Sequence, residues 1–172
     1  MRKIILQVAV SLDGFIEGIN GEIDWCFTDQ DYGLKDFFKQ IDTVFMGRKT
    51  YELMLTMGPD ATAGFPKLKQ YIFSTTLNEV KDDSVIIKDD IQLQVEKIKN
   101  DNGKNIWLFG GGNLTTSLMN LNLVDEVWLA VHPVLLGGGI PLFDNLKERV
   151  SLKLIDTQTY STGLVFLKYS IG

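Results

Sequence analysis

Three consecutive glycines, Gly110 to Gly112, are the residues whose type and spacing most clearly suggest chemistry. They follow an apolar stretch and precede a segment that can form a helix. Because glycine has no side chain, a pyrophosphate can approach the backbone there, and the free N–H groups of a helix start attract anions. The run lacks the GxGxxG spacing and the acidic residue that usually binds a ribose. It therefore leaves two interpretations open: a phosphate-binding loop, or a tight turn that binds nothing.

Two further places combine the end of an apolar stretch with groups that bind anions. At the first, Gly47 is followed by Arg48, which can hold a phosphate through two parallel hydrogen bonds, and by Thr50, which can cap a helix or donate to the same anion. At the second, Ser74 and Thr75 carry hydroxyl groups, although such residues are also common in turns. Together with the glycines, these residues predict a site for a dinucleotide that carries a 2′-phosphate.

The chain has a single histidine, His132, and a single cysteine, Cys26. A lone histidine in an apolar strand is more often a packed, hydrogen-bonded residue than a proton donor, and a lone cysteine is by default a partly buried thiol. We therefore expect neither a metal centre nor an intramolecular disulfide. A chain without disulfides suits a reducing compartment, so we expect a cytoplasmic protein.

The apolar periodicity predicts the elements that must position these residues. Strands are expected at 3–10, 43–46, 71–74, 85–87, 105–109 and 127–136, and helices at 34–40, 50–56, 91–100 and 114–121. Two alternating strands, 152–159 and 164–170, predict a hairpin at the C-terminal end. The pattern predicts a three-layer α/β sandwich with a mostly parallel central sheet and an antiparallel C-terminal hairpin. In such folds ligands bind at the carboxyl ends of the strands, where the glycine clusters fall.

Length and composition fit one globular domain over residues 1–172, with 45% apolar and 23% charged residues. No apolar run approaches the roughly 18 residues of a membrane helix, so no membrane partner is expected. The formal net charge of −5 argues against nucleic acid as a partner, because clustered cations bind phosphate backbones. The terminal hairpin leaves a sheet edge that a second copy could cover, which predicts a homodimer.

Several blocks, in order along nearly the whole chain, resemble the dihydrofolate-reductase-like superfamily. The resemblance is closest to the reductase (C-terminal) domain of the bacterial bifunctional riboflavin biosynthesis protein RibD and its stand-alone relatives. The blocks are the S-x-D-G turn at 11–16, the G-R-x-T-[WFY]-E motif at 47–52, the glycines at 110–112, and the segments 123–127 and 133–143. The resemblance implies a dihydrofolate-reductase-like sandwich with NADPH lying across the strand ends.

The same resemblance implies which residues bind NADPH. Ala9 would offer backbone hydrogen bonds to the nicotinamide amide, and Ile16 and Gly18 would lie on the loop over the nicotinamide ring. The residues that would hold the adenosine with its 2′-phosphate are Gly47, Arg48, Thr50, Ser74 and Thr75. The residues that would hold the pyrophosphate are Gly110, Gly111, Gly112, Asn113 and Leu114.

Folate reductases carry an acidic residue on the helix after a conserved tryptophan, and here Trp25 is present. Counting back from Gly47 places Asp31 at the corresponding position, with Asp29 and Asp36 as close competitors. The implied function is an NADPH-dependent reductase that transfers hydride to a C=N or C=O bond of a small pterin- or pyrimidine-like heterocycle, with Asp31 as the catalytic acid. The alternative is a non-catalytic NADPH-binding or sensor protein, because a fold does not settle activity.

Overall fold

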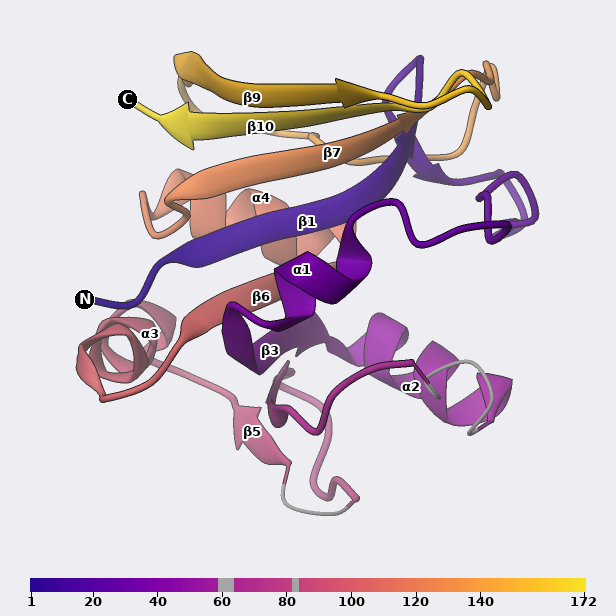
Figure 1. Ribbon diagram of the computed structural model, residues 1–172. Helices are drawn as coiled ribbons and strands as arrows, with labels where there is room; N and C mark the ends of the chain where they lie inside the picture. The colour runs from indigo at the N-terminus through magenta and orange to yellow at the C-terminus, as the bar shows by residue number, and fades with distance from the viewer. Residues whose placement is uncertain (59–63, 82–83) are drawn as a thin grey trace.

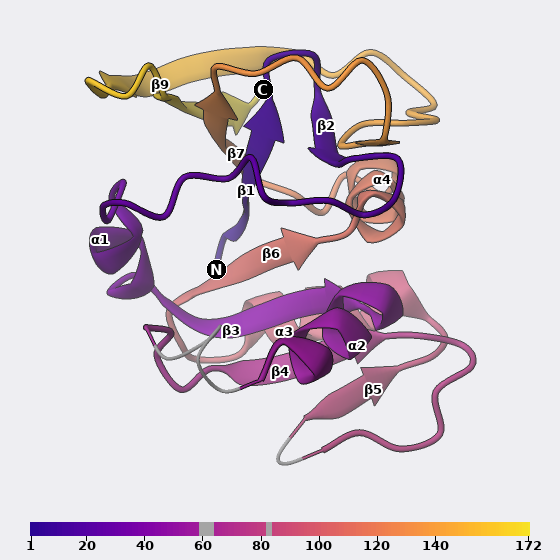
Figure 2. The same cartoon turned by 90° about the vertical axis from the view of Figure 1, so that its right-hand side faces the viewer.

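The computed structural model describes residues 1–58, 64–81 and 84–172. Its frame is an eight-stranded sheet with the order β5-β4-β3-β6-β1-β7-β10-β9, so β5 and β9 are its edges (Figures 1 and 2). The strands are β1 (Ile4–Ser11), β3 (Ile41–Gly47), β4 (Lys69–Phe73), β5 (Val85–Ile87), β6 (Asn105–Gly110), β7 (Glu126–His132), β9 (Leu152–Thr159) and β10 (Val165–Ile171). The helices are α1 (Leu34–Phe38), α2 (Arg48–Met57), α3 (Ile91–Asn100) and α4 (Gly112–Asn120).

The neighbouring strands from β5 to β7 run parallel, and β10 pairs antiparallel with both β7 and β9. The predicted mostly parallel sheet with an antiparallel C-terminal hairpin is therefore confirmed. Strand β1 lies between β6 and β7, and its residues Ile4, Ile5 and Leu6 are at most 1% exposed. A strand covered on both faces needs such an apolar run, and for this reason the sequence alone predicts a strand here.

Helices cover both faces of the sheet, which gives the three predicted layers; Figure 2 shows α1 and α4 on opposite sides. On one face, α3 and α4 pack on a core that includes Phe45 and Leu118. On the other face, which we call the α1–α2 face, a second core includes Phe37 and Trp107. In the buried strands, successive side chains alternate between these two cores.

Because β1, β3, β4 and β6 are parallel, their carboxyl ends lie at the same edge of the sheet. In the register of the strands, Gly47 of β3 is opposite Phe73 of β4, and Met46 of β3 is opposite Gly110 of β6. The three segments that the sequence marked as anion-binding therefore leave adjacent strands side by side.

Two features differ from the prediction. The strand expected at 127–136 ends at His132, because Pro133 has no N–H to continue the ladder, and Leu135 is exposed. A separate antiparallel pair, β2 (Phe15–Glu17) with β8 (Ile140–Pro141), was not predicted, since both strands are short and lie far apart in the sequence. Among the helices of the described residues, none has the length and apolarity that crossing a bilayer requires.

Candidate functional site

Two helices begin at neighbouring strand ends, and a glycine precedes each of them. Gly47 is the N-cap of α2 and Gly111 is the N-cap of α4, and neither cap provides a side-chain hydrogen bond. The two starts touch, because the Gly111 N–H donates to Thr50 Oγ1 over 3.2 Å. Helix starts leave backbone N–H groups free and carry partial positive charge, so this junction suits an anion. We call the junction, residues 47–50 with 110–114, the glycine cradle.

The fold explains two of the three glycines, each for a different physical reason. Gly110 has a φ of +101°, in the left-handed region that glycine adopts freely. A Cβ on Gly112 would lie 2.9 Å from the carbonyl oxygen of Pro141, so the packing of β8 against α4 explains this glycine. A Cβ on Gly111 would meet only Thr50 Oγ1, at 3.4 Å. Packing within the fold therefore explains Gly112, whereas a Cβ on Gly111 would be in van der Waals contact with the Thr50 hydroxyl alone.

Arg48, Ser74 and Thr75 follow the adjacent strands β3 and β4, as the sequence predicted. Arg48 Nη1 donates to both carboxylate oxygens of Glu52, at 3.0 and 2.9 Å, and the Nε and Nη2 edge makes no hydrogen bond to the described residues. Ser74 Oγ accepts the N–H of Leu77 over 3.0 Å in a local turn, and Thr75 is exposed. One edge of a guanidinium thus remains open beside two hydroxyl-bearing residues.

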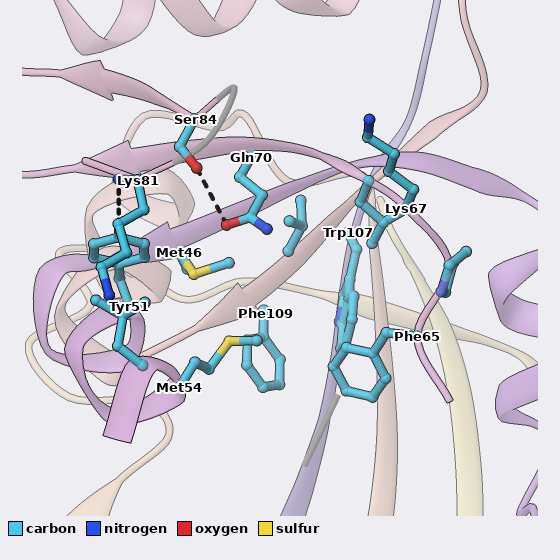
Figure 3. Close-up of a pocket in the computed structure, with 14 residues that line it drawn as sticks. Met46, Tyr51, Met54, Phe65, Lys67, Gln70, Lys81, Ser84, Trp107 and Phe109 are labelled. Carbon is cyan, nitrogen blue, oxygen red and sulfur yellow. Dashed lines mark hydrogen bonds between the residues drawn. The ribbon is translucent and has the colours of Figure 1, made fainter. Parts of the chain in front are cut away.

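A cavity of about 630 Å³ opens on the α1–α2 face directly beside the strand ends (Figure 3). It is lined by Val44 and Met46 of β3 and by Trp107 and Phe109 of β6, together with residues of α2 and of the segment around Phe65. Met46 and Phe109 immediately precede the glycines of the two helix starts. A molecule in this cavity would therefore lie next to a ligand held by the glycine cradle.

The cavity is mainly aromatic and apolar. The ring centroids of Trp107 and Phe109 are 4.6 Å apart, and that of Phe65 is 5.4 Å from Trp107. Gln70 Oε1 accepts from Ser84 Oγ over 3.4 Å in the upper part of Figure 3. The ionisable side chains among the described lining residues are two lysines and one tyrosine, with no carboxylate. This lining suits a planar ring that is neutral or negatively charged.

The three candidate carboxylates lie near α1, and each is engaged locally. Asp31 is exposed, and its Oδ1 accepts the N–H of Lys35 over 3.1 Å at the start of the helix. Asp29 accepts from the Tyr32 hydroxyl over 2.6 Å, and Asp36 is exposed and ion-paired within α1 and its C-cap. The assignment of Asp31 as the catalytic acid stays a prediction.

The residues predicted to contact the nicotinamide separate into two groups. Ala9 lies near the end of β1, opposite Ala130 of β7 in the α1–α2 core, so two small side chains leave room at this strand end. Ile16 lies in β2 and packs against the core of the opposite face, and Gly18 is buried, with its N–H donating to the Glu22 carbonyl. By alternation along β1, Ala9 lies on the α1–α2 face of the sheet, on which the cavity also opens. Ile16 and Gly18 belong to β2 and the loop that follows it.

His132 fixes a loop in place. Its Nε2 accepts the Phe27 N–H over 3.1 Å, and its Nδ1 donates to the Ala130 carbonyl over 2.9 Å. The residue is 3% exposed and meets the Trp25 ring edge-on, with centroids 5.3 Å apart. Both ring nitrogens are occupied, which supports the packed, hydrogen-bonded interpretation of this histidine.

Burial raises the pKa of the nearby Cys26 thiol to about 11, so this cysteine is protonated at neutral pH.

We expect His132 to make the protein less stable in mild acid. Burial lowers the pKa of His132 in the folded state, so the unfolded chain binds a proton more readily. This histidine's contribution is therefore fully present above pH ~6.5 and is lost as the pH falls below that value, with a slope of at most about 1.4 kcal/mol per pH unit. Urea unfolding between pH 7.5 and 5.5 measures the slope. His132→Gln should show a shallower loss than the parent, and equal slopes would refute the assignment.

Asp13 joins two of the sequence blocks that carry the resemblance. Its carboxylate accepts from Ser11 Oγ over 2.6 Å and from the backbone N–H groups of Leu136 and Gly137 over 3.1 and 2.8 Å. The hydrogen bond from Ser11 lowers the pKa of Asp13, so the carboxylate stays ionised. The S-x-D-G turn is thus tied to the loop that leads into β8 beside α4. The sequence does not predict that Asp13 joins these two blocks, because Leu136 and Gly137 lie more than half the chain away from it.

Known proteins resemble this chain in fold and in sequence. Dihydrofolate reductase from Enterococcus faecalis, complexed with NADP(H) and RAB-propyl, superposes with a TM-score of 0.71 at 16% identity, covering 99% of this chain and 96% of that chain. A putative riboflavin biosynthesis protein from Shewanella sp. PV-4 superposes with a TM-score of 0.86 at 27% identity, covering 100% and 99%. The protein YyaP of Bacillus subtilis (strain 168) is 48% identical over 177 residues, which cover 98% of this chain and 94% of YyaP.

The fold and the strand-end site thus define a dihydrofolate-reductase-like protein, as the sequence indicated. The profile of the RibD C-terminal domain family matches residues 2–166. The chain belongs to the RibD C-terminal domain family.

Proposed function

We propose that this protein is an NADPH-dependent reductase that transfers hydride to a C=N or C=O bond of a small pterin- or pyrimidine-like heterocycle. The observation that carries the proposal is the contact between two glycine-capped helix starts directly beside an aromatic cavity. Such a junction binds phosphates, and the cavity holds a flat ring next to them. The family and the fold, which include reductases, support an oxidoreductase at this coarse level.

The residues of the glycine cradle fit a dinucleotide. Thr115, which is fully buried, has a hydroxyl with no hydrogen-bond partner among the described residues, and this hydroxyl lies 3.4 Å from where a Cβ on Gly110 would be. Buried polar atoms are usually bonded, so an incomplete network beside the glycines fits a site that a ligand completes. The backbone at 111–114 would hold the pyrophosphate, and the open edge of Arg48 with Thr50, Ser74 and Thr75 would hold the 2′-phosphate. When bound, NADPH supplies the hydride.

The protein's own part in the reaction is to orient the substrate, exclude water and deliver a proton. The aromatic and apolar lining of the cavity provides a surface against which a flat acceptor can lie. Hydride transfer to carbon leaves a negative charge on the nitrogen or oxygen of the reduced bond, and a proton donor must neutralise it. We assign that role to Asp31, acting directly or through water.

Asp31→Asn is expected to lower turnover by about 100-fold or more, the ordinary contribution of a positioned acid, while NADPH affinity is preserved. Asparagine still accepts the Lys35 N–H at the start of α1, so the helix start is retained. Oxidation of NADPH followed at 340 nm, with pterins, pyrimidines and small carbonyl compounds as acceptors, provides the measurement. Asp29→Asn and Asp36→Asn are the matched controls, and greater loss in either control would move the acid to that position.

A specific observation favours a second candidate, an NADPH-binding protein without catalysis. No carboxylate is found among the described residues that line the aromatic cavity, and Asp31 is turned toward its own helix. Tight NADPH binding without NADPH oxidation for any acceptor of the panel would favour this binding protein over the reductase.

The remaining proposals concern the oligomeric state and the cellular compartment of the protein. We propose that residues 1–172 act as one cytoplasmic domain that forms a homodimer through the edge strand β9. This strand is exposed along its length, and its exposed side chains include Leu152, Leu154 and Ile155. Sedimentation equilibrium with the parent and with Leu154→Lys tests the dimer. The parent should sediment as a dimer and the variant as a monomer, and a monomeric parent would end this proposal.

A further inference from the structure

Residues 18–33, which connect β2 to α1, pass the carboxyl ends of the central strands. Figures 1 and 2 show this connection passing the end of β1 before it enters α1. In open α/β sheets, ligands bind outside the carboxyl ends of the strands. The connection therefore lies where its position controls how a ligand reaches the strand ends.

His132 holds the middle of this connection, residues 24–28, against the sheet. His132 ends β7 and lies opposite Ser11, the last residue of β1. Its Nε2 accepts the Phe27 N–H over 3.1 Å, and its ring centroid lies 5.3 Å from that of Trp25 and 5.0 Å from that of Phe27. Within the described part of the chain, the bond from Phe27 is the one hydrogen bond that joins residues 24–28 to the sheet.

The hydrogen bond from Phe27 requires a neutral imidazole. An N–H donor needs the lone pair of Nε2, so the proton of the neutral ring is on Nδ1, which donates to the Ala130 carbonyl over 2.9 Å. When the ring takes up a second proton, Nε2 becomes a donor that faces another donor. Because two N–H groups repel each other, residues 24–28 must then move away from the ring.

The charge of His132 is set by burial and by the backbone. Burial lowers the pKa of His132, hydrogen bonding to the backbone of Ala130 and Val10 opposes this shift, and no charged group contributes to it. On the side of β10, the neighbouring pair is the apolar one of Val165 with Val131. The ionisable residues of the other packed segments, the connection and the turn after β1, are Asp24, Cys26 and Asp13. The Asp13 carboxylate is turned toward Ser11 and the N–H groups at 136 and 137.

We infer that His132 is a positioning residue, whose neutral imidazole holds residues 24–28 beside the strand ends and releases them when it takes up a proton. The inference deepens the proposed function, on which it rests for the identity of the ligand, because it adds a control by pH to the same site. The release is local, so the sheet stays folded while the connection loses its attachment.

The first test needs no ligand. His132 is the single histidine of the chain, so the NMR signal of its ring C2–H reports its protonation directly. We expect the exchange protection of the Phe27 amide, corrected for the intrinsic rate, to fall at least tenfold as the pH is lowered from 7.5 through the midpoint of that signal. The amides of β1 should keep their protection. Constant protection of Phe27 through the midpoint, or a parallel loss in β1, would overturn the inference.

Two variants separate the hydrogen bond from the packing of the ring. His132→Gln offers an amide oxygen that accepts the Phe27 N–H at every pH, whereas His132→Leu fills the space without an acceptor. We expect the Phe27 amide to stay protected from pH 7.5 to 5.5 in His132→Gln and to be poorly protected throughout in His132→Leu. A response to pH in His132→Gln as large as that of the parent would overturn the inference.

Kinetics test the link to the proposed reaction. One pH unit below the midpoint, about a tenth of His132 is neutral, so we expect the parent's KM for an acceptor that it reduces to be about tenfold higher than at pH 7.5. The KM of His132→Gln should change less than twofold, and an equal change in both proteins would overturn the inference. If the parent reduces no acceptor, the proposed function falls, while the Phe27 amide still decides whether His132 holds residues 24–28.

Discussion

Gly111→Ala is expected to lower NADPH affinity by roughly 100-fold or more while the protein stays folded. A methyl group there would occupy the open side of the glycine cradle and push the pyrophosphate away from the N–H groups of Gly112 and Asn113. Two hydrogen bonds to a charged group contribute about 1.5–3 kcal/mol each, which sets the size of the loss. Within the protein, the new Cβ would meet only Thr50 Oγ1 at 3.4 Å, so a small shift of that hydroxyl accommodates it.

The neighbouring glycines provide the contrast for this experiment. Gly110→Ala and Gly112→Ala are expected to lower the melting temperature strongly, because one has a φ of +101° and the other would press against the Pro141 carbonyl at 2.9 Å. Gly64→Ala, where a Cβ meets nothing within 4 Å, controls for removal of a glycine in general. Calorimetric titration with NADPH gives the affinity of each variant, and thermal melts without NADPH give its melting temperature. If Gly111→Ala binds NADPH as tightly as the parent, the glycines serve only the turn.

Arg48→Ala is expected to weaken NADPH binding by about tenfold and to leave NADH binding nearly unchanged. The 2′-phosphate is the chemical difference between the two cofactors, and the open Nε and Nη2 edge of Arg48 is placed to bind it. A hydrogen bond to a charged group contributes about 1.5–3 kcal/mol, and the side chain is 40% exposed, which reduces the effect toward the lower end. Equilibrium titrations with both cofactors give the selectivity directly.

Glu52→Gln is the matched control for Arg48. It removes the charge that Arg48 Nη1 now contacts at 3.0 and 2.9 Å but keeps the guanidinium. We expect NADPH to bind at least as tightly to Glu52→Gln as to the parent, because a negative charge near the phosphate is gone. If Arg48→Ala weakened NADPH and NADH equally, Arg48 would support the fold of the cradle instead of reading the 2′-phosphate.

Much of the fold was predictable because its signals are local. The unbroken apolar runs of the parallel strands, the helical spacing of 91, 95 and 98, and the alternation around Ser161 to Gly163 each lie within a short window. The anion-binding segments were also predictable, since the ends of parallel strands share one edge of a sheet. The pair β2–β8 was not predictable, because each strand is at most three residues long and its partner is distant.

The parts of the site that escaped prediction depend on contacts between distant segments. Whether His132 donates a proton or holds the Phe27 loop depends on how two segments meet, and only the structure shows that both ring nitrogens are used. The same holds for the aromatic cavity, which combines β3, β6 and α2 with the Phe65 segment.

Equilibrium titration of the parent protein with NADPH and with NADH, followed by calorimetry, tests the central claim most directly. The arrangement of the glycine cradle predicts one NADPH site per chain, with NADPH bound at least tenfold more tightly than NADH, the difference contributed by about one charge-assisted hydrogen bond. No measurable NADPH binding, or equal affinity for the two cofactors, would contradict the assignment of this strand-end site to NADPH.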